Sequence, residues 1–189
     1  SKRYPAGQEA LAGISFHVEP GEMVFVTGHS GAGKSTLLKL LARIERPSRG
    51  IVTLDGQNLS KLGENRVPRL RRKLGMVFQD HRLLLDRSVF ANVELPLVID
   101  GMAPGERARR VRAALEKVGL LSYENQAPVT LSTGEQQRVG IARAIVTKPT
   151  LLIADEPTTA LDVTVQRQVL QLLRHHARAR RTAILFITH

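Results

Sequence analysis

The segment "GHSGAGKS", residues 28–35, has the residue types and spacing of a loop that holds phosphate groups. It matches G-x-x-x-x-G-K-[ST], in which glycines allow tight turns and a close approach of the backbone to phosphate. Consecutive N–H groups then converge on the phosphates, Lys34 supplies a cation, and the Ser35 hydroxyl can ligate Mg²⁺. A glycine-rich turn with a chance lysine is disfavoured by the strand-like run before the segment and the helical pattern after it. The expected nucleotide contacts are Gly28, His29, Ser30, Gly31, Ala32, Gly33, Lys34, Ser35 and Thr36.

Two adjacent carboxylates, Asp155 and Glu156, follow the apolar run "LLIA". A buried strand would carry them to the edge of a parallel sheet where the phosphate loop also lies. Asp155 could then hold Mg²⁺ through its water shell, and Glu156 could orient or deprotonate an attacking water. An acidic helix cap would explain one carboxylate, but it explains this pair poorly.

Two further polar residues, Gln79 and His189, also end apolar strand-like runs. Either would be ordinary alone, but parallel strands would bring both to the same edge as Asp155. Gln79 could contact Mg²⁺ or water, and His189 could donate an N–H to the γ-phosphate. The chemistry implied is attack of water on the γ-phosphoryl group of a nucleotide. The candidate catalytic residues are therefore Glu156, His189 and Gln79, and the candidate metal ligands are Ser35, Gln79 and Asp155.

A second potential phosphate site begins at "LSTGEQQR", residues 131–138. Ser132 could cap a helix there, and Glu135 could reach back to the cap residue. The free N–H groups of such a helix start are suited to a phosphate. The segment lies about a hundred residues beyond a stronger phosphate loop, so its own sequence leaves open which phosphate it would serve.

The elements that must position these residues alternate between strands and helices. Strand-like runs occur in 11–18, 22–28, 51–56, 75–79, 150–157 and 182–189. In the helix after Gly33, Leu37, Leu41 and Ile44 fall on one face, which we expect to be buried. Continuous apolar strands alternating with helices predict a parallel sheet that is covered on both faces. We expect one domain, with residues 1–79 and 150–189 as the nucleotide-binding core. Residues 80–149 are mostly helical in pattern and would form a helical subdomain inserted into that core.

Composition limits the remaining possibilities. The formal net charge is +11, concentrated in "RLRRK", "RARR" and "RHHARARR", which suits solvated helix faces, an anionic membrane surface or nucleic acid. Aromatic residues make up only 4%, which disfavours a single-strand stacking platform, and no nucleic-acid partner is expected. No apolar run approaches the ~20 residues of a membrane span, and no signal peptide is visible. Because the chain starts at Ser1 without methionine and stops directly after a strand-like run, we expect it to be trimmed at both ends.

The motifs together resemble the ATPases of ATP-binding cassette (ABC) transporters. "GHSGAGKST", "VFQD", "LSTGEQQR", "LLIADEP", "TALD" and a terminal "TH" occur in the order that this family shows. The resemblance implies a P-loop NTPase fold, α/β, with a mainly parallel sheet core, an N-terminal antiparallel β portion and the inserted helical subdomain. It implies ATP and Mg²⁺ as cofactors and a homodimer of ATPase domains paired head to tail. Each copy would contact the other copy's nucleotide through Ser132, Thr133, Gly134, Glu135 and Asp162, and Tyr4 would stack on adenine.

A narrower resemblance is to the FtsE type of cell-division ATPases, carried by residues 28–50, 70–97 and 114–121. It implies a peripheral subunit on the cytoplasmic face of the bacterial inner membrane, bound to an integral membrane partner of FtsX type. The family docks such partners just after Gln79, where Leu83, Leu84 and Leu85 could contribute an apolar surface or pack within the helical subdomain. The alternatives are the ATPase of an importer or lipoprotein exporter, an ATP-binding scaffold with weak hydrolysis, and a soluble DNA-repair or translation ATPase.

Thr133 departs from the glycine that the family usually has at this position. A Cβ and a hydroxyl would stand where backbone approaches phosphate closely. Slower turnover or weaker pairing would follow unless the site adjusts, although the hydroxyl could also donate a hydrogen bond. This departure is the feature that favours the scaffold alternative, whereas Glu156 favours hydrolysis.

Overall fold

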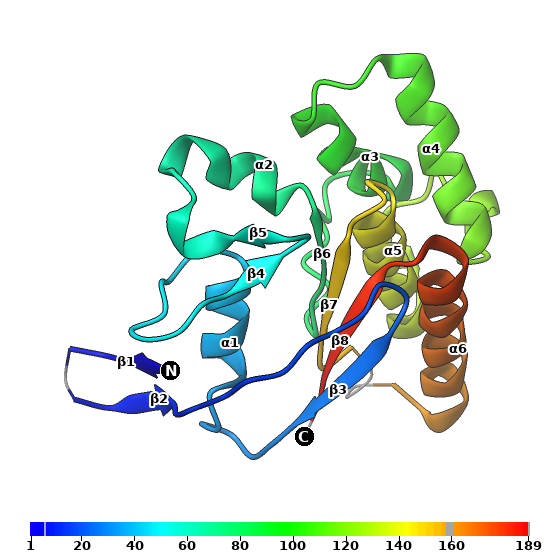
Figure 1. Ribbon diagram of the computed structural model, residues 1–189. Helices are drawn as coiled ribbons and strands as arrows, with labels where there is room; N and C mark the ends of the chain where they lie inside the picture. The colour runs from blue at the N-terminus through cyan, green and yellow to red at the C-terminus, as the bar shows by residue number, and fades with distance from the viewer. Residues whose placement is uncertain (6, 158–160, 189) are drawn as a thin grey trace.

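A four-stranded parallel sheet forms the centre of the protein (Figure 1). The computed structural model describes residues 1–5, 7–157 and 161–188. The strands follow the order β3 (Met23–Thr27), β8 (Ala183–Thr188), β7 (Leu151–Asp155) and β6 (Leu74–Val77). Their apolar sequences favour this arrangement, since a parallel sheet covered on both faces buries the side chains of alternate residues equally. The central strands β7 and β8 are accordingly the most deeply buried.

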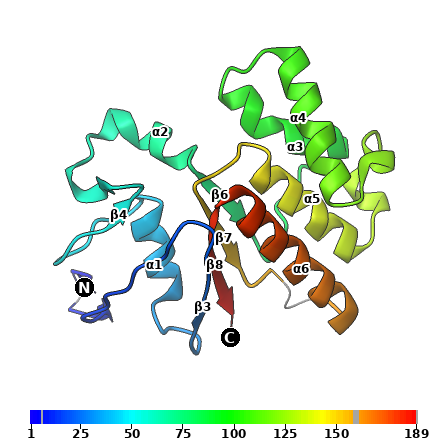
Figure 2. The ribbon, with the colours of Figure 1, turned by 45° about the vertical axis from the view of Figure 1, so that its right-hand side comes forward.

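Helices cover the two faces of the sheet (Figure 2). On one face α1 (Lys34–Leu41) packs Leu38 and Leu41 against Ile153 and Leu185. On the other face lie α5 (Thr133–Ile145) and α6 (Val163–Arg180). The helices α3 (Val89–Ile99) and α4 (Pro104–Lys117) pack against α5 and share one continuous apolar core with the sheet.

The remaining elements are short. Two antiparallel pairs, β1 (Lys2–Arg3) with β2 (Glu9–Leu11) and β4 (Thr53–Leu54) with β5 (Gln57–Asn58), precede α2 (Val67–Arg71). Single 3₁₀ turns occupy Leu59–Lys61, Glu64–Arg66, Leu121–Tyr123 and Pro128–Thr130. The predicted fold class, a mainly parallel core with an N-terminal antiparallel portion and added helices, is confirmed. Within the described residues, no helix combines the length and hydropathy needed to cross a membrane.

Two local predictions are wrong. The strand expected over 11–18 ends at Leu11, because Gly13 adopts a left-handed conformation (φ 58°) that interrupts an extended strand. Ile44, predicted to face the core, is 63% exposed. The helix ends at Leu41, and the left-handed conformation of Arg43 (φ 53°) turns the chain before Ile44 is reached.

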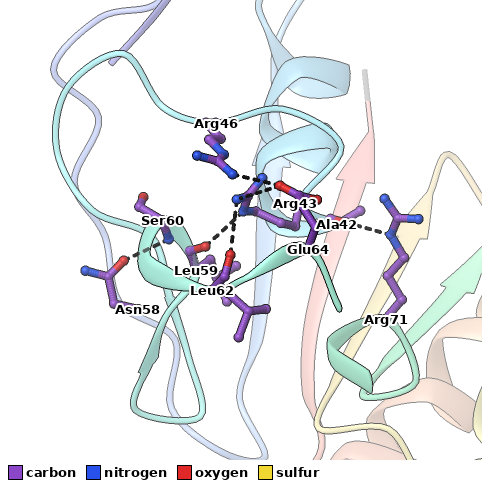
Figure 3. Close-up of polar contacts among 9 residues, drawn as sticks. All are labelled: Ala42, Arg43, Arg46, Asn58, Leu59, Ser60, Leu62, Glu64 and Arg71. Atoms are coloured by element: carbon purple, nitrogen blue, oxygen red, sulfur yellow. Dashed lines mark hydrogen bonds and ion pairs between the residues drawn. The ribbon is translucent and has the colours of Figure 1, made fainter. Parts of the chain in front are cut away.

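A buried arginine joins α1 to the segment that follows β5 (Figure 3). Arg43 donates from Nε to the Leu59 carbonyl (2.9 Å) and from Nη2 to the Leu62 carbonyl (3.3 Å). Glu64 accepts from both Arg43 (3.3 Å) and Arg46 (2.7 Å), and these bonds hold the pKa of Glu64 below its usual value. Because α1 begins in the phosphate loop, this network anchors the far end of the helix that must hold the loop in place.

His176 gives the fold a pH dependence. This α6 side chain is buried (6% exposed), and its Nε2 atom has no hydrogen-bond partner within the described part of the chain. Burial, followed by the charges of Lys117, Arg180 and His175, lowers the pKa of His176 to about 4. An unfolded histidine titrates near pH 6.5, so the unfolded chain binds a proton that the folded chain excludes between these two values.

We therefore expect stability to fall as the pH drops from 7 to 5. With partial solvent screening the loss attributable to His176 is about 1 kcal/mol, which corresponds to about 2–4 °C in Tm for a domain of this size. Thermal unfolding at both pH values should show a smaller decrease in a His176→Leu variant, whereas a variant of its exposed neighbour, His175→Leu, should keep the wild-type decrease. An unchanged decrease in His176→Leu would refute this assignment.

Candidate active site

The carboxyl ends of the four parallel strands bring the predicted site residues to one edge of the sheet. Thr27, the residue before the phosphate loop, pairs with Thr188, and Asp155 pairs with Ile187. Val77, the last residue of β6, pairs with Ala154, so Gln79 comes two residues after the end of the neighbouring strand. His189 lies outside the described residues, and its predicted contact with the γ-phosphate stays a prediction.

The phosphate loop is held tightly against β2. Gly33, the residue before α1, adopts φ 91°, and a Cβ at this position would collide with the Ala10 carbonyl oxygen and lie 2.7 Å from Leu11 Cδ2. Glycine is thus required here by both conformation and space. The Lys34 ammonium donates to the Gly28 carbonyl and lies 3.5 Å from the His29 carbonyl. The lysine is therefore folded over the loop, where its charge can meet phosphate.

Asp155 and Glu156 form a pair of carboxylates at the end of β7. Burial, and after it the charge of Glu156, raises the pKa of Asp155, while Lys34 and Arg82 act in the opposite direction. Glu156 adopts a left-handed conformation (φ 45°), and its N–H donates to the Ile187 carbonyl (3.0 Å). The backbone thus leaves the strand in a sparsely populated conformation that β8 holds in place, as is common at functional sites.

The donor set fits a magnesium ion that a nucleotide helps to bind. A partly desolvated carboxylate beside a second carboxylate favours a cation, and a hydroxyl and an amide are oxygen donors suited to Mg²⁺. In the described part of the chain, no cluster of three or more His, Cys, Asp or Glu residues could hold a metal alone. Ser35, Gln79 and Asp155 would therefore act together with nucleotide phosphates, which commonly complete the shell of Mg²⁺.

Tyr4 lies beside the first turn of α1. Its hydroxyl is 3.4 Å from Thr36 Oγ1, and Lys2 Nζ lies 5.1 Å from the centre of its ring. The side chain is thus next to the phosphate loop despite the separation in sequence. This position is compatible with the predicted stacking on adenine, which stays a prediction.

The second helix start has the predicted capping box. The Ser132 hydroxyl accepts from the Glu135 N–H (3.4 Å), and Glu135 Oε2 accepts from the Ser132 N–H (2.8 Å) and hydroxyl (2.7 Å). The hydroxyl bond, followed by the backbone bond, lowers the pKa of Glu135. Thr133 is exposed in the first turn and is absent from the residues with positive φ, so its own backbone does not require glycine. Any slowing of turnover or weakening of pairing by Thr133 must therefore arise where this residue contacts another molecule.

The starts of α5 and α6 lie together. A Cβ at Gly134 would approach Val165 Cγ1 to 3.0 Å, so a small residue is needed where the two helices meet. Asp162 caps α6 by accepting from the N–H groups of Thr164 and Val165, both at 3.0 Å. The residues predicted to contact a second copy's nucleotide, Ser132 to Glu135 and Asp162, thus belong to two adjoining helix starts.

The structure adds two residues that the motifs did not indicate, one on α5 and one on α3, which hold the loop between β6 and α3. Arg143 on α5 donates to the carbonyls of His81 and Arg82, both at 2.6 Å. Asn92 is fully buried and bonds both the N–H (2.7 Å) and the carbonyl (2.9 Å) of Leu84. Helical spacing places Arg143 one turn after Gly140 on α5, but only the fold reveals that this face meets the loop.

The sheet edge is distinct from a cavity of about 490 Å³ found elsewhere. That cavity lies under residues 14–20, between the β4–β5 region and the sheet, and its walls include none of residues 28–36. Residues 29–32 of the phosphate loop are themselves exposed, so this part of the loop lies on an open surface. An open edge of this kind suits a site whose other wall comes from a second molecule.

Comparisons with known proteins point to one family. A family model described as ABC transporter matches residues 11–159. The chain is 53% identical over all 189 residues to the cell division ATP-binding protein FtsE of Escherichia coli (strain K12), covering 85% of that protein. FtsE of Haemophilus influenzae is 47% identical over 100% of this chain and 87% of its own. The methionine import ATP-binding protein MetN 3 of Pectobacterium atrosepticum is 44% identical over 95% of this chain and 52% of its own.

Solved structures agree with this result. A dimeric ATP-binding cassette in a post-hydrolysis state, bound to ADP and Pi, matches 100% of this chain and 84% of its own with a TM-score of 0.85 and 35% identity. The cbiO1 protein of Clostridium perfringens, part of the ABC transporter complex cbiONQ, matches 99% of this chain and 74% of its own with a TM-score of 0.92 and 32% identity. With the phosphate loop and the carboxylate pair on one sheet edge, these matches establish that the chain belongs to the ABC transporter family and is an ATPase of that family.

Proposed function

We propose that the protein hydrolyses Mg²⁺-bound ATP at a site completed by a second copy and drives an FtsX-type membrane partner in cell division. The observation that carries the hydrolytic part is the register of the sheet, which sets the phosphate loop, Asp155 and Glu156 on one edge. The adjoining starts of α5 and α6 support the shared site, because the end of a helix that presents free N–H groups suits a phosphate, here that of the other copy.

Each residue in this proposal has a distinct task. Lys34 and the N–H groups of the phosphate loop bind the β- and γ-phosphates, and Tyr4 stacks on adenine. Ser35, Gln79 and Asp155 hold Mg²⁺, which neutralises phosphate charge when bound. Glu156 orients and deprotonates the attacking water, and His189 contacts the γ-phosphate. Ser132 and Asp162 of the second copy close the site.

The loop after β6 is the proposed dock for the membrane partner. Leu83 packs against the main core, whereas Leu84 is 36% exposed and Leu85 is 57% exposed. The exposed leucines offer apolar area in the loop that follows Gln79. Together with 53% identity to a cell division ATP-binding protein, this favours an FtsX-type partner and a location on the cytoplasmic face of the bacterial inner membrane.

Co-purification tests the partner assignment. An FtsX-like membrane protein expressed with this chain should co-purify with it, and a Leu84→Asp/Leu85→Asp variant should lose the complex while retaining ATP binding. Stable pairing with a methionine-type permease instead would favour the importer alternative, which the 44% identity to a MetN protein keeps open.

A substitution of Thr133 tests how closely the second copy approaches the nucleotide. In a Thr133→Gly variant we expect ATP hydrolysis to be unchanged or up to about threefold higher, because removing the Cβ relieves contact with the other copy's phosphate. Steady-state hydrolysis should be compared with Thr133→Ser, which keeps the hydroxyl and removes one methyl group. A marked loss of activity in Thr133→Gly but not in Thr133→Ser would instead assign the hydroxyl a stabilising hydrogen bond.

A further inference from the structure

The arginines of α6 lack the acidic partners that the other basic clusters have. On α4 the arginines pair with Glu94, Glu106 and Glu124. Around α2, Asp100 and Asp55 pair with an arginine and a lysine in the same way. Residues 163–189, in contrast, contain no acidic residue. Within the described part of the chain, no ion pair is formed by the arginines of this stretch, Arg167, Arg174, Arg178, Arg180 and Arg181. The described residues therefore leave this positive charge without a counter-charge.

Three of these residues form an arginine stripe along α6: Arg167, Arg174 and Arg178. They are seven and four positions apart, so they fall on one side of a helix with about 3.6 residues per turn. All three are exposed, and at about 1.5 Å per residue the stripe is about 16 Å long. The opposite side of the helix carries its buried residues, Val169, Leu173, His176 and Ala177. Because α6 lies on the outside of the molecule (Figure 2), the stripe faces solvent.

The chemistry of the arginine stripe suits a surface that presents phosphate groups. A guanidinium donates in a planar fork that matches phosphate oxygens, and it stays charged at any physiological pH. Interfaces between proteins, in contrast, depend on a few large anchors that become buried at their centre. Among the exposed large apolar residues of the described chain, only Val163 belongs to α6, and it is the first residue of the helix. This face therefore favours phosphate groups over a protein partner.

We propose that the arginine stripe binds the phosphate groups of an anionic phospholipid membrane. The charges are complementary, because anionic headgroups attract each arginine that lies near the membrane surface. Duplex nucleic acid presents the same phosphate groups, but a membrane is favoured because the chain belongs to the ABC transporter family, whose members act at membranes. The inference goes beyond the proposed function, since it requires neither ATP hydrolysis nor an FtsX-type partner.

Sedimentation of the purified protein with lipid vesicles tests this inference. Vesicles with equal parts of phosphatidylcholine and phosphatidylglycerol should bind the wild type, and vesicles of phosphatidylcholine alone should not. Added salt should release the bound protein, because it screens the charges. In the triple variant Arg167→Gln/Arg174→Gln/Arg178→Gln we expect the affinity for the anionic vesicles to fall about 30-fold or more. Glutamine should preserve α6, since its helix propensity is close to that of arginine.

The matched control is a second triple variant, Lys61→Gln/Arg66→Gln/Arg69→Gln, which removes the same charge from exposed positions in and before α2. It should stay within about threefold of the wild type, because its charges lie away from the stripe. Thermal unfolding of both variants should match the wild type, which verifies that they are folded.

The outcomes separate this inference from its alternatives and from the proposed function. A loss of vesicle binding in the α6 variant alone supports the membrane contact. Equal losses in both variants, or wild-type binding that is no stronger to the anionic vesicles than to the neutral ones, would overturn it. Unchanged vesicle binding in the α6 variant, together with lost binding of duplex DNA, would assign the stripe to nucleic acid instead. ATP hydrolysis without vesicles is measured separately, and its absence in the wild type would contradict the proposed function alone.

Discussion

A Glu156→Gln protein is expected to bind ATP and to hydrolyse it at least about 100-fold more slowly than the wild type. The amide keeps the shape of the side chain but cannot accept a proton from water. The left-handed backbone at Glu156 and its bond to Ile187 depend on the main chain, so the substitution should leave them in place. The loss should therefore appear in kcat and not in nucleotide affinity.

Hydrolysis under saturating ATP, with affinity measured separately, checks this expectation. Glu116→Gln makes the same chemical change at an exposed position on α4 and should have wild-type activity. Wild-type turnover no faster than that of Glu156→Gln, with ATP bound by both, would favour the scaffold with weak hydrolysis.

Lys34→Ala is expected to weaken ATP binding by about 100-fold or more, and hydrolysis with it. In the structure the ammonium donates to the Gly28 carbonyl inside the loop, so its charge is already directed at the phosphate position. Removing it takes away the cation that the phosphate loop directs at the β- and γ-phosphates.

Lys39→Ala is the matched control, because it removes an exposed lysine from the same helix. Equilibrium nucleotide binding should be unchanged in Lys39→Ala and nearly lost in Lys34→Ala. Retained affinity in Lys34→Ala would mean that the nucleotide binds somewhere other than this loop.

The sequence predicted the parts of the site that depend on local order along the chain. The apolar run before Asp155 predicts a buried strand, and the spacing of Ser132 and Glu135 predicts the capping box found at α5. Both are short-range features, since a few neighbouring residues determine them. Alternation of strands and helices likewise sufficed for the parallel sheet.

Features that depend on contacts between distant segments could not be predicted in this way. The bonds from Arg143 to residues 81 and 82 span about sixty positions, and no periodicity links them. The turn at Arg43, which leaves Ile44 exposed, is stabilised by carbonyls of a segment some sixteen residues away. Tertiary bonds of this kind override the helical pattern that predicted Ile44 in the core.

Mixing two inactive variants tests most directly whether two copies share each site. Lys34→Ala removes the phosphate-loop cation, and Ser132→Arg should block the helix start offered to the other copy. In a mixed dimer of these variants, one site combines an intact loop with an intact helix start, so random pairing should restore about one quarter of wild-type hydrolysis. The control mixture contains wild-type protein and a chain that carries both substitutions. Each mixed dimer in it then has one defect at each of its two sites, so the mixed dimers should contribute no hydrolysis. The contradicting result has two parts. The mixture of the two single variants recovers no hydrolysis, and the control mixture keeps hydrolysis in simple proportion to its share of wild-type chains. Together these results would show that each chain hydrolyses ATP alone.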